Sequence, residues 1–429
     1  MTARGKYHGY LESVFPATSW RIQDINGGCV NTILRVVKTS GTATAESFIL
    51  KHARPSFGEP EYIQEFSLKR QASFTSFQIV FQSTEVALTA EQEIERTALG
   101  LWDVGKPLYD RKEDESGRWR VPKCIRHDMG AESRLGLTDN DSEASVLLIE
   151  DLGDVQDIMG YLEDCAKLPA LPPNLEAHIF SAGQSLGTSL AKLHSQKTLA
   201  EIARHPSIMA VFSQSLTNHL VWSAMLDSLP EYLSSFEDGN ELYQRVERDF
   251  KTAQYDYSLV LCHGDFHTGN VMVSSASASP AAPAVIDWEF AHLGRGVNDD
   301  AAKFTASIHC MLIDARRGNN NETLANLLRR LISGFCSGYR ETAQRRYDAK
   351  NPDDANLQLL RSAMLFHGTE MIVFASEFIP DSAALQEVLS VGAWYLRRSC
   401  ADANAFAKQN LAVLALEEDE RIMGSLFLN

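Results

Sequence analysis

The chain has 429 residues, of which 44% are hydrophobic and 22% are charged, a composition typical of a globular protein with a large core. With 40 basic and 56 acidic residues its formal net charge is −16, which argues against nucleic acid partners and favours cationic ligands. No apolar run is long enough to span a membrane, and the N-terminal residues lack the apolar core of a signal peptide.

Seven cysteines are scattered along the chain, and none forms a Cys-x-x-Cys pair. An odd number of isolated cysteines predicts reduced thiols in a cytoplasmic protein and no disulfide framework. The length predicts two lobes or domains. The expected partner is a small molecule, without a nucleic acid or a membrane, and the sequence carries no signal for the oligomeric state.

The N-terminal region predicts a series of strands. Residues 25–37 are typical of a strand, a tight turn at Gly27 and Gly28, and a second strand. A glycine pair lets backbone N–H groups approach a phosphate without a Cβ in the way, although a plain hairpin turn fits the same pattern. The next predicted strand carries Lys51 near its end, where a lysine either holds nucleotide phosphates or faces solvent.

Residues 56–90 show no clean period, and we predict a partly ordered insertion there. Thr89 then predicts the start of a helix as its N-cap, with acidic residues in the first turn. Apolar residues recur at helical spacing along the following turns. Periodicity does not choose among three acidic candidates for the partner of Lys51, which are Glu91, Glu93 and Glu95.

Residues 110–144 are crowded with charge and predict a surface loop around a short strand at 121–122. Residues 145–153 predict a buried strand that ends in a turn. Leucines at helical spacing predict an amphipathic helix over 185–194, with His194 at its end as a cap for the last carbonyls.

Two apolar runs further along the chain each end in acidic or amide side chains. The first delivers His-Gly-Asp with Asp265, followed five positions later by Asn270, and the second delivers Asp287 and Glu289 as Asp-x-Glu. Phosphoryl transfer needs a carboxylate near the attacking hydroxyl and oxygen ligands for magnesium. We therefore predict that Asp265 orients the hydroxyl and accepts its proton, while Asn270 and Asp287 hold Mg²⁺. Glu289 would assist through water or a second ion.

Two other interpretations fit parts of this pattern. The runs are also typical of ordinary hairpin strands that end in capping aspartates. A zinc site would use Cys262, His263 and His267, but zinc needs three or four convergent ligands at recognisable spacing, and none is evident elsewhere in the sequence. His263 is expected instead to brace the loop by hydrogen bonding.

His-Gly-Asp-x4-Asn followed by Ile-Asp-Trp-Glu resembles the aminoglycoside phosphotransferase and choline kinase superfamily. The resemblance implies an α+β, bilobal, protein-kinase-like fold. Its N-terminal nucleotide-binding lobe, residues 1–150, would hold an antiparallel sheet with one main helix. Its larger, mostly helical C-terminal lobe, residues 151–429, would carry catalysis and substrate binding. Gly-Gly-x-Val-Asn at 27–31 and Ile-Leu-Lys-His-Ala at 49–53 resemble the methylthioribose kinase and hydroxytryptamine kinase branches in particular.

The resemblance also implies roles for residues of the first lobe. It places the glycine-rich turn at the nucleotide, makes Lys51 a phosphate contact, and selects Glu95 as its partner because Ala-Leu follows at the family spacing. The strand that ends near residue 150 resembles the hinge between kinase lobes, where backbone groups read adenine. The implied nucleotide-binding residues are Gly27, Gly28, Asn31, Lys51, Glu95, Glu150 and Leu152.

After Glu289 the family usually has Gly-Pro and then Asp-Leu-Ala, whereas this chain has Arg295-Gly296 and a pair of aspartates. Spacing favours Asp300 as the aspartate that caps a helix and buttresses the catalytic loop. Residues 322–429 predict helices, which in this superfamily form the acceptor pocket. Candidate lining groups are His367, Glu370, Glu377, Trp394 and Tyr395.

The sequence thus predicts an ATP- and Mg²⁺-dependent phosphotransferase that acts on a hydroxyl of a small molecule, such as an amine-bearing alcohol or sugar. Lys51, Asp265, Asn270 and Asp287 would converge around one triphosphate. A protein kinase is the alternative enzyme, but His-Arg-Asp, Asp-Phe-Gly and Ala-Pro-Glu are missing. A non-catalytic nucleotide-binding scaffold is the alternative outside enzymes.

Overall fold

The structure is a computed structural model that forms two compact units. The first takes its residues from Met1–Leu108, Val121–Gly153 and Trp288–Phe290, and the second from Tyr109–Arg120, Asp154–Asp287 and Ala291–Asn429. The described residues are 3–25, 32–53, 87–101, 119–129, 145–213, 225–252, 259–274, 282–318, 320–348, 350–351, 353–379, 382–400, 406 and 422–427. Gly27, Gly28, Asn31 and most of the predicted insertion lie outside them.

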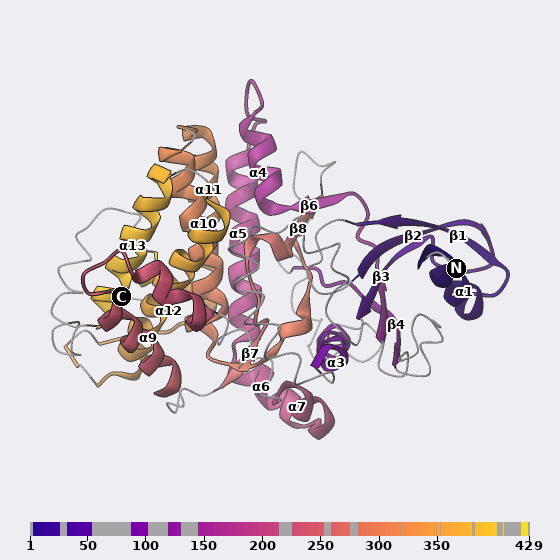
Figure 1. The fold of residues 1–429 in the computed structure, drawn as a ribbon, viewed down its shortest axis with the longest axis horizontal. Coiled ribbons are helices and arrows are strands. Elements are labelled where there is room, and N and C mark those ends of the chain that lie inside the picture. The colour runs from indigo at the N-terminus through magenta and orange to yellow at the C-terminus, as the bar shows by residue number, and fades with distance from the viewer. Residues whose placement is uncertain are drawn as a thin grey trace. The chain divides into compact units, whose positions relative to one another are not determined.

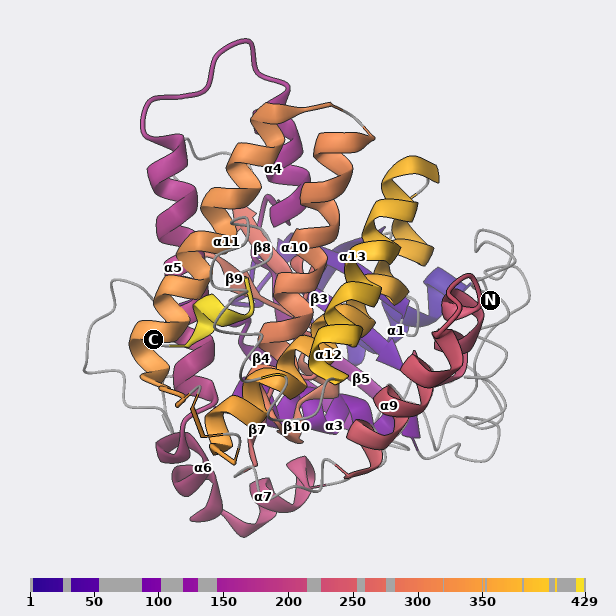
Figure 2. The same cartoon turned by 90° about the vertical axis from the view of Figure 1, so that its left-hand side faces the viewer.

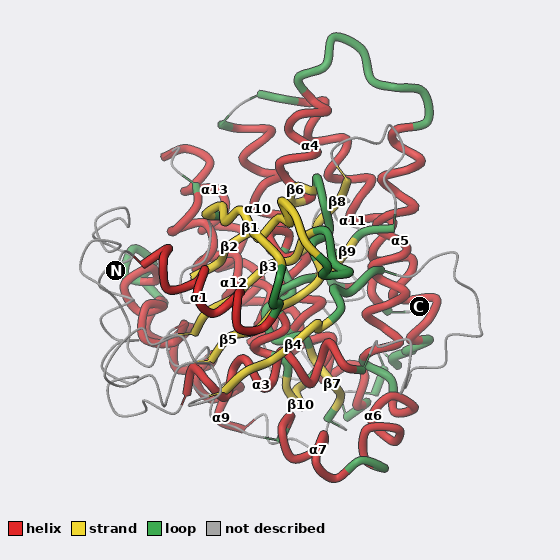
Figure 3. Tube along the Cα trace, turned by 90° about the vertical axis from the view of Figure 1, so that its right-hand side faces the viewer, coloured by secondary structure: helices red, strands yellow, loops and turns green. Residues whose placement is uncertain are grey.

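The first unit is built on an antiparallel sheet of five strands in the order β1-β2-β3-β5-β4 (Figures 1 and 3). β5 is buried along nearly its whole length, whereas β1 and β2 alternate between buried and more exposed residues and so bury one face. The strands are β1 (Thr18–Asp24), β2 (Thr32–Gly41), β3 (Ser47–Ala53), β4 (Cys124–Met129) and β5 (Ser145–Glu150).

The predicted strand at 121–122 is wrong, because the strand in this region is β4, which begins at Cys124. Pro122 has no backbone N–H and cannot donate to a ladder. The pairing with β5 begins two residues later, where Cys124 lies opposite Ile149.

Two helices complete the first unit, α1 (Ala3–Val14) and α3 (Ala87–Gly100). The helix α1 buries Tyr7, Tyr10 and Leu11 against the apolar residues of β1, β2 and β3. The main helix, α3, begins at Ala87, so the predicted N-cap, Thr89, lies inside the helix and the prediction is wrong. Ala87 and Leu88 are strong helix formers, which extends the helix past the residue that would have capped it.

The second unit is mostly helical (Figure 2). Its long helices α5, α10, α11, α12 and α13 pack side by side, and the helical prediction for the C-terminal region is confirmed over the described residues. The helices are α4 (Ile158–Ala166), α5 (Leu175–Leu193), α6 (Gln196–Ala203), α7 (Pro206–Phe212), α9 (Gly239–Thr252), α10 (Asp300–Arg317), α11 (Glu322–Ala343), α12 (Ala355–Phe378) and α13 (Ser382–Cys400).

The helices α5 and α11 meet backbone to backbone through two Gly-x-x-x-Gly pairs. A Cβ built on Gly183 or Gly187 of α5 would lie 2.3 Å or 2.0 Å from a carbonyl oxygen of α11. In return, a Cβ on Gly334 or Gly338 of α11 would lie 2.1 Å or 2.2 Å from a carbonyl oxygen of α5. Only hydrogen fits at these four positions, which fixes how the two helices lie against each other.

Short strands and 3₁₀ turns carry the sequence motif within the second unit (Figure 3). An antiparallel sheet has the order β6-β8-β9, and a separate pair joins β7 to β10. These elements are β6 (Val155–Asp157), β7 (Val260–Cys262), η4 (Thr268–Asn270), β8 (Val271–Ser274), β9 (Ala284–Val285), β10 (His292–Gly294), η6 (Gly296–Asn298) and η8 (Gly424–Leu426).

The predicted α+β class is confirmed, with the antiparallel sheet in the first unit and the long helices in the second. The described cysteines are free thiols, as predicted: Cys124, Cys165, Cys262, Cys310 and Cys336. Within the described part of the chain, none of the helices has the length and apolarity that crossing a membrane requires.

Candidate active site

Lys51 is the buried cation of the first unit. It lies on β3 with only 4% of its side chain exposed, and its Nζ is 2.6 Å from Glu95 Oε2 on α3. The carboxylate on α3 that pairs with Lys51 is therefore Glu95, the candidate that the resemblance selected. A buried cation needs such partners, because desolvation without them costs several kcal/mol.

Glu289 supplies a second carboxylate to the same lysine. Its Oε2 is 3.1 Å from Lys51 Nζ, and its side chain is 5% exposed. It lies in the 3₁₀ turn η5 (Trp288–Phe290), which packs on α3. We predicted Glu289 as a magnesium ligand, and no sequence pattern indicated its ion pair with Lys51. The structure thus shows Lys51 held between Glu95 and Glu289.

The end of β5 forms the segment predicted to read adenine. Glu150 is the last residue of β5, and its N–H donates to the carbonyl of Lys123 at 2.8 Å. Arg35 on β2 donates from Nε and Nη2 to the two carboxylate oxygens of Asp151, at 2.8 Å and 2.6 Å, and also from Nη2 to the carbonyl of Gly153. Leu152 lies between the two residues that Arg35 holds.

The loop that follows β7 carries the His-Gly-Asp motif. Gly264 has φ +84°, a left-handed conformation that glycine adopts without strain. His263 braces the loop, as predicted, because its Nε2 donates to the carbonyl of Ile286 at 2.9 Å and its Nδ1 accepts the N–H of Asp265 at 3.2 Å. Burial lowers the pKa of His263, which favours this neutral form.

The side chain of Asp265 is 23% exposed and contacts groups of both charges. Asn270 Nδ2 donates to the backbone carbonyl of Asp265 at 2.9 Å and to its Oδ2 at 3.2 Å. Lys303 Nζ lies 2.8 Å from Oδ1, and His267 Nε2 lies 3.4 Å from Oδ2. Burial raises the pKa of Asp265, but Lys303 and His267 outweigh it and hold that pKa well below its usual range.

Asn270 and Asp287 are brought together by the pairing of β8 with β9. Val271 lies opposite Val285, and the N–H of Ile286 donates to the carbonyl of Asn270 at 3.1 Å. Asp287 follows with φ +65°, a strained conformation that aspartate tolerates better than most residues and that is common at functional sites. Because the Asn270 amide nitrogen bonds Asp265, its oxygen is left as a ligand. Carboxylate and amide oxygens suit Mg²⁺.

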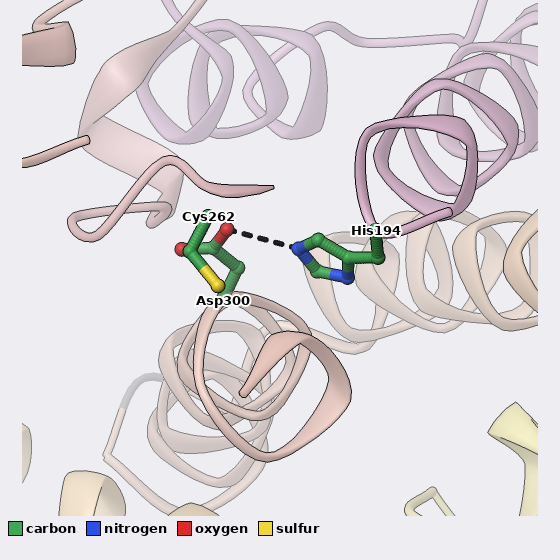
Figure 4. A group of neighbouring side chains, drawn as sticks. All are labelled: His194, Cys262 and Asp300. Atoms are coloured by element: carbon green, nitrogen blue, oxygen red, sulfur yellow. Dashed lines mark hydrogen bonds and ion pairs between the residues drawn. The ribbon is translucent and has the colours of Figure 1, made fainter. Parts of the chain in front are cut away.

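Asp300 buttresses this loop, as the sequence predicted (Figure 4). Its Oδ2 accepts the N–H of His263 at 2.6 Å, and its Oδ1 accepts the N–H of Gly264 at 2.8 Å. His194 Nε2 donates to Oδ2 at 3.1 Å, while its Nδ1 accepts from the Tyr339 hydroxyl at 3.0 Å. Burial raises the pKa of Asp300, but His194 outweighs it and lowers that pKa.

The helix cap that we predicted at Asp300 is wrong, and His194 caps α5 through its backbone N–H and not through its ring. Asp300 is the first residue of α10, and its carboxylate bonds the loop; Asp299 holds the N-cap position without a side-chain capping bond. The His194 ring lies at the end of α5 but contacts Asp300 and Tyr339 instead of the last carbonyls. In both cases a buried tertiary partner replaces the local backbone partner.

Cys262 lies beside His194 and Asp300, which resembles a set of metal ligands (Figure 4). Burial raises the pKa of the Cys262 thiol well above its usual value. Asp300 already accepts from two backbone N–H groups and His194. The cluster is therefore a hydrogen-bonded support for the loop, and it is a different set from the Cys262, His263 and His267 of the zinc interpretation.

The sequence did not reveal that Lys303 lies beside Asp265 or that Glu370 lies beside Lys303. Lys303 Nζ lies 4.0 Å from Glu370 Oε1, besides its closer contact with Asp265. Burial raises the pKa of Glu370. Lys303 comes three residues after Asp300, so both share a helix face. That spacing is the one signal in the sequence that could have indicated Lys303.

The other candidate lining groups of the acceptor pocket have different surroundings. His367 and Tyr395 are fully buried and pack on each other with ring centroids 4.6 Å apart, so they are core residues. Trp394 is partly buried and packs on Tyr395. The side chain of Glu377 lies outside the described residues.

Several solved structures are similar to this chain. A microcompartment-associated aminopropanol kinase is 15% identical, with 97% of this chain and 99% of that chain covered and a TM-score of 0.46. Wild-type aminoglycoside 2'-phosphotransferase-IIIa in its GDP complex is 14% identical, with 96% and 100% covered and a TM-score of 0.44. The choline kinase LicA from Streptococcus pneumoniae is 11% identical, with 92% and 99% covered and a TM-score of 0.33.

No curated protein sequence matches the chain. The model of the phosphotransferase enzyme family, in contrast, matches residues 145–301. This segment runs from β5 through the His-Gly-Asp loop and β9 to the beginning of α10, so it contains Asp265, Asn270, Asp287 and Asp300. Residues 145–301 are thus similar to the phosphotransferase enzyme family, in agreement with the resemblance drawn from the motifs.

Proposed function

We propose that this enzyme transfers the γ-phosphoryl group of ATP to a hydroxyl group of a small molecule. The observation that carries the proposal is the surroundings of Asp265. Its carboxylate is held ionised by Lys303, oriented by Asn270, and placed on a loop that Asp300 anchors through two backbone bonds. Such a carboxylate can align an attacking hydroxyl without moving during the reaction.

The reaction forms a bond between the acceptor oxygen and the γ-phosphorus while the bond to the β–γ bridging oxygen breaks, and ADP leaves. The hydroxyl proton passes to Asp265. Because the pKa of Asp265 is held low, this carboxylate is a weak proton acceptor and accepts a hydrogen bond before it accepts the proton. Phosphoryl transfer tolerates a weak base, since its loose transition state places little demand on the nucleophile.

The nucleotide would be held by residues of the first unit. In this proposal Lys51 contacts the phosphates, with Glu95 and Glu289 to keep its ammonium in place. Gly27, Gly28 and Asn31 would approach the phosphates, and the backbone of Glu150 and Leu152 would read adenine. The convergence of Lys51 with Asp265, Asn270 and Asp287 on one triphosphate stays a prediction.

Asn270 and Asp287 would hold Mg²⁺, and Glu289 would reach the ion only through water because Lys51 already engages its carboxylate. When bound, the ion neutralises phosphate charge that the side chains alone would leave uncompensated. The donor set supports this assignment, since both residues offer oxygen atoms and no thiolate or imidazole.

The acceptor proposed here is an amine-bearing alcohol or sugar. The net charge of −16 favours a cationic molecule, and Glu370 adds a carboxylate 4.0 Å from Lys303. We place the enzyme in the cytoplasm, which the free thiols of its described cysteines support.

An acceptor panel tests the proposal. The purified protein is incubated with Mg²⁺ and ATP labelled in the γ-phosphate, together with amino alcohols, amino sugars, neutral sugars or a mixture of peptides. Transfer of label to a small alcohol is the expected result, and omission of Mg²⁺ should abolish it. Label on peptide only would favour the protein kinase alternative. Nucleotide binding without transfer to any acceptor or to water would favour the scaffold.

A further inference from the structure

The helix α10 contacts three consecutive residues of the loop that carries the His-Gly-Asp motif: His263, Gly264 and Asp265. Asp300 accepts the N–H groups of His263 and Gly264, and Lys303, one helical turn later, lies 2.8 Å from Asp265 Oδ1. Residues three apart on a helix share a face. Asp300 therefore fixes the backbone of the loop, whereas Lys303 reaches the one side chain that the proposed reaction uses.

Lys303 is itself paired with two carboxylates. Its ammonium lies 2.8 Å from Asp265 and 4.0 Å from Glu370 of α12, and only 17% of the lysine side chain is exposed. Burial lowers the pKa of Lys303, but Asp265 and Glu370 outweigh it and hold that pKa above its usual value. The ammonium consequently stays charged and cannot leave without separating two partly buried carboxylates from their cation.

The two oxygens of Asp265 have different partners. Oδ1 faces Lys303, and Oδ2 faces Asn270 at 3.2 Å and His267 at 3.4 Å. The Lys303 contact is the shortest of the three and comes from a different element than the other two. Without it, the carboxylate would keep only longer contacts from its own loop, and rotation about its side-chain torsions would be restrained less.

We propose that Lys303 is a positioning residue for phosphoryl transfer, whose ammonium, paired with both Glu370 and Asp265, sets the orientation of the Asp265 carboxylate toward the acceptor hydroxyl. This inference rests on the proposed function. It assigns to α10 a direct part in turnover, beyond the support that Asp300 gives to the loop.

The decisive experiment is a double-mutant cycle between Lys303 and Asp265. We expect Lys303→Met to lower kcat about a hundredfold, the loss that a misplaced catalytic group typically causes, while the KM for ATP changes less than about twofold. In the Asp265→Asn background the same substitution should lower the residual kcat less than about threefold, because a positioning residue acts only through its partner.

A substitution that retains the charge and a measurement of stability distinguish a positioning role of Lys303 from a role in folding. Lys303→Arg retains a cation and should keep more than about a tenth of the wild-type kcat, whereas Lys303→Gln, which retains polarity without charge, should resemble Lys303→Met. Lys167→Met is the matched control, because Lys167 forms an exposed pair with Asp164 at 3.0 Å, far along the chain from this loop. Thermal unfolding of every variant is measured alongside, and Lys303→Gln decides the matter where Lys303→Met does not fold.

Three results would overturn the inference while leaving the proposed function intact: a wild-type kcat in folded Lys303→Met and Lys303→Gln, equal losses in the Arg and Met variants at unchanged Tm, or multiplicative losses in the double mutant. A wild-type protein that phosphorylates no acceptor would instead overturn the proposed function, and this inference with it.

Discussion

The carboxylates around the His-Gly-Asp loop have different roles because their immediate neighbours differ. Asp265 faces the Lys303 ammonium and the His267 ring, Asp300 faces two backbone N–H groups, and Glu370 lies buried at 4.0 Å from its nearest cation. The pKa of the first two is lowered against the effect of burial, while burial raises that of the third. Residue type alone does not distinguish these roles.

Asp265→Asn should abolish most turnover while nucleotide binding persists. The amide keeps the size of the side chain but cannot accept the hydroxyl proton, and general-base contributions are typically about 10²–10⁴-fold in rate. Steady-state kinetics with the best acceptor of the panel, together with calorimetric titration of ATP, would measure both quantities. An unchanged kcat would contradict the role assigned to Asp265.

Asp300→Ala should lower the unfolding free energy of the protein. The substitution leaves two buried N–H groups and His194 without their acceptor, and breaking such a buried network typically costs about 3 kcal/mol of unfolding free energy or more. Urea denaturation would measure the loss. Asp164→Ala, which removes an exposed partner of Lys167, is the control and should change the unfolding free energy little.

Glu93 should make the fold sensitive to acid. Burial raises its pKa, but Arg96 and His127 outweigh this and lower it to about 2 from the usual 4.5. Between these values the unfolded chain binds the proton and the folded chain does not, so the stabilisation is present above pH 4.5 and is lost as the pH falls toward 2. Urea unfolding of the wild type and Glu93→Gln should therefore differ at pH 6, differ less at pH 3 and converge toward pH 2. The same difference at all of these pH values would exclude this linkage.

At the scale of elements, the contact between α5 and α11 depends on four glycines. In Gly187→Ala the new Cβ would lie 2.0 Å from the Phe335 carbonyl oxygen, so the helices must separate. Overpacking of this kind typically costs about 1–3 kcal/mol, which thermal unfolding would register as a lower Tm. Gly9→Ala is the control, because nothing lies within 4 Å of its Cβ. Since alanine favours helix by about 1 kcal/mol, Gly9→Ala should raise the Tm or leave it unchanged.

Arg35 links β2 to the segment after β5 and should affect the use of ATP more than the chemical step. Arg35→Met removes the bonds to Asp151 and Gly153 on either side of Leu152, so the backbone proposed to read adenine loses its support. We expect the KM for ATP to rise about tenfold, corresponding to about 1.4 kcal/mol, with kcat nearly unchanged.

The matched control for this change is Lys38→Met on the same strand, because Lys38 pairs with the exposed Glu46. It should leave the KM for ATP at its wild-type value. A fall in kcat at constant KM in Arg35→Met would show that the guanidinium serves another step than nucleotide binding.

At the scale of the whole molecule, the features that the sequence predicted correctly are those that short local patterns determine. The helices of the C-terminal region follow from periodicity, and the α+β class follows from the family resemblance that the motifs carry. The His-Gly-Asp loop is also part of the segment that the family model matches. His263 and Asp300 were assigned to the support of the loop before their partners were known, because both belong to recognisable motifs.

What the sequence did not reveal depends on contacts between distant residues. Lys303 reaches Asp265 across 38 positions of the chain, and Glu289 reaches Lys51 across 238. No periodicity links such pairs. The Gly-x-x-x-Gly repeats of α5 and α11 were visible in the sequence, but a single glycine in a helix is locally unfavourable, and only the partner helix explains why four occur. The capping assignments failed for the same reason.

Because of the glycine contact between α5 and α11, a change in the length of either helix would also alter the support of the catalytic loop. His194 ends α5 and receives the hydroxyl of Tyr339, which follows Gly338 directly in α11. An insertion of one residue between Gly187 and His194 would turn the imidazole by about 100° around the helix axis, away from both Tyr339 and Asp300. Insertions and deletions should therefore be absent from these two segments in any active descendant of this chain, while the loops at the opposite helix ends remain open to changes of length.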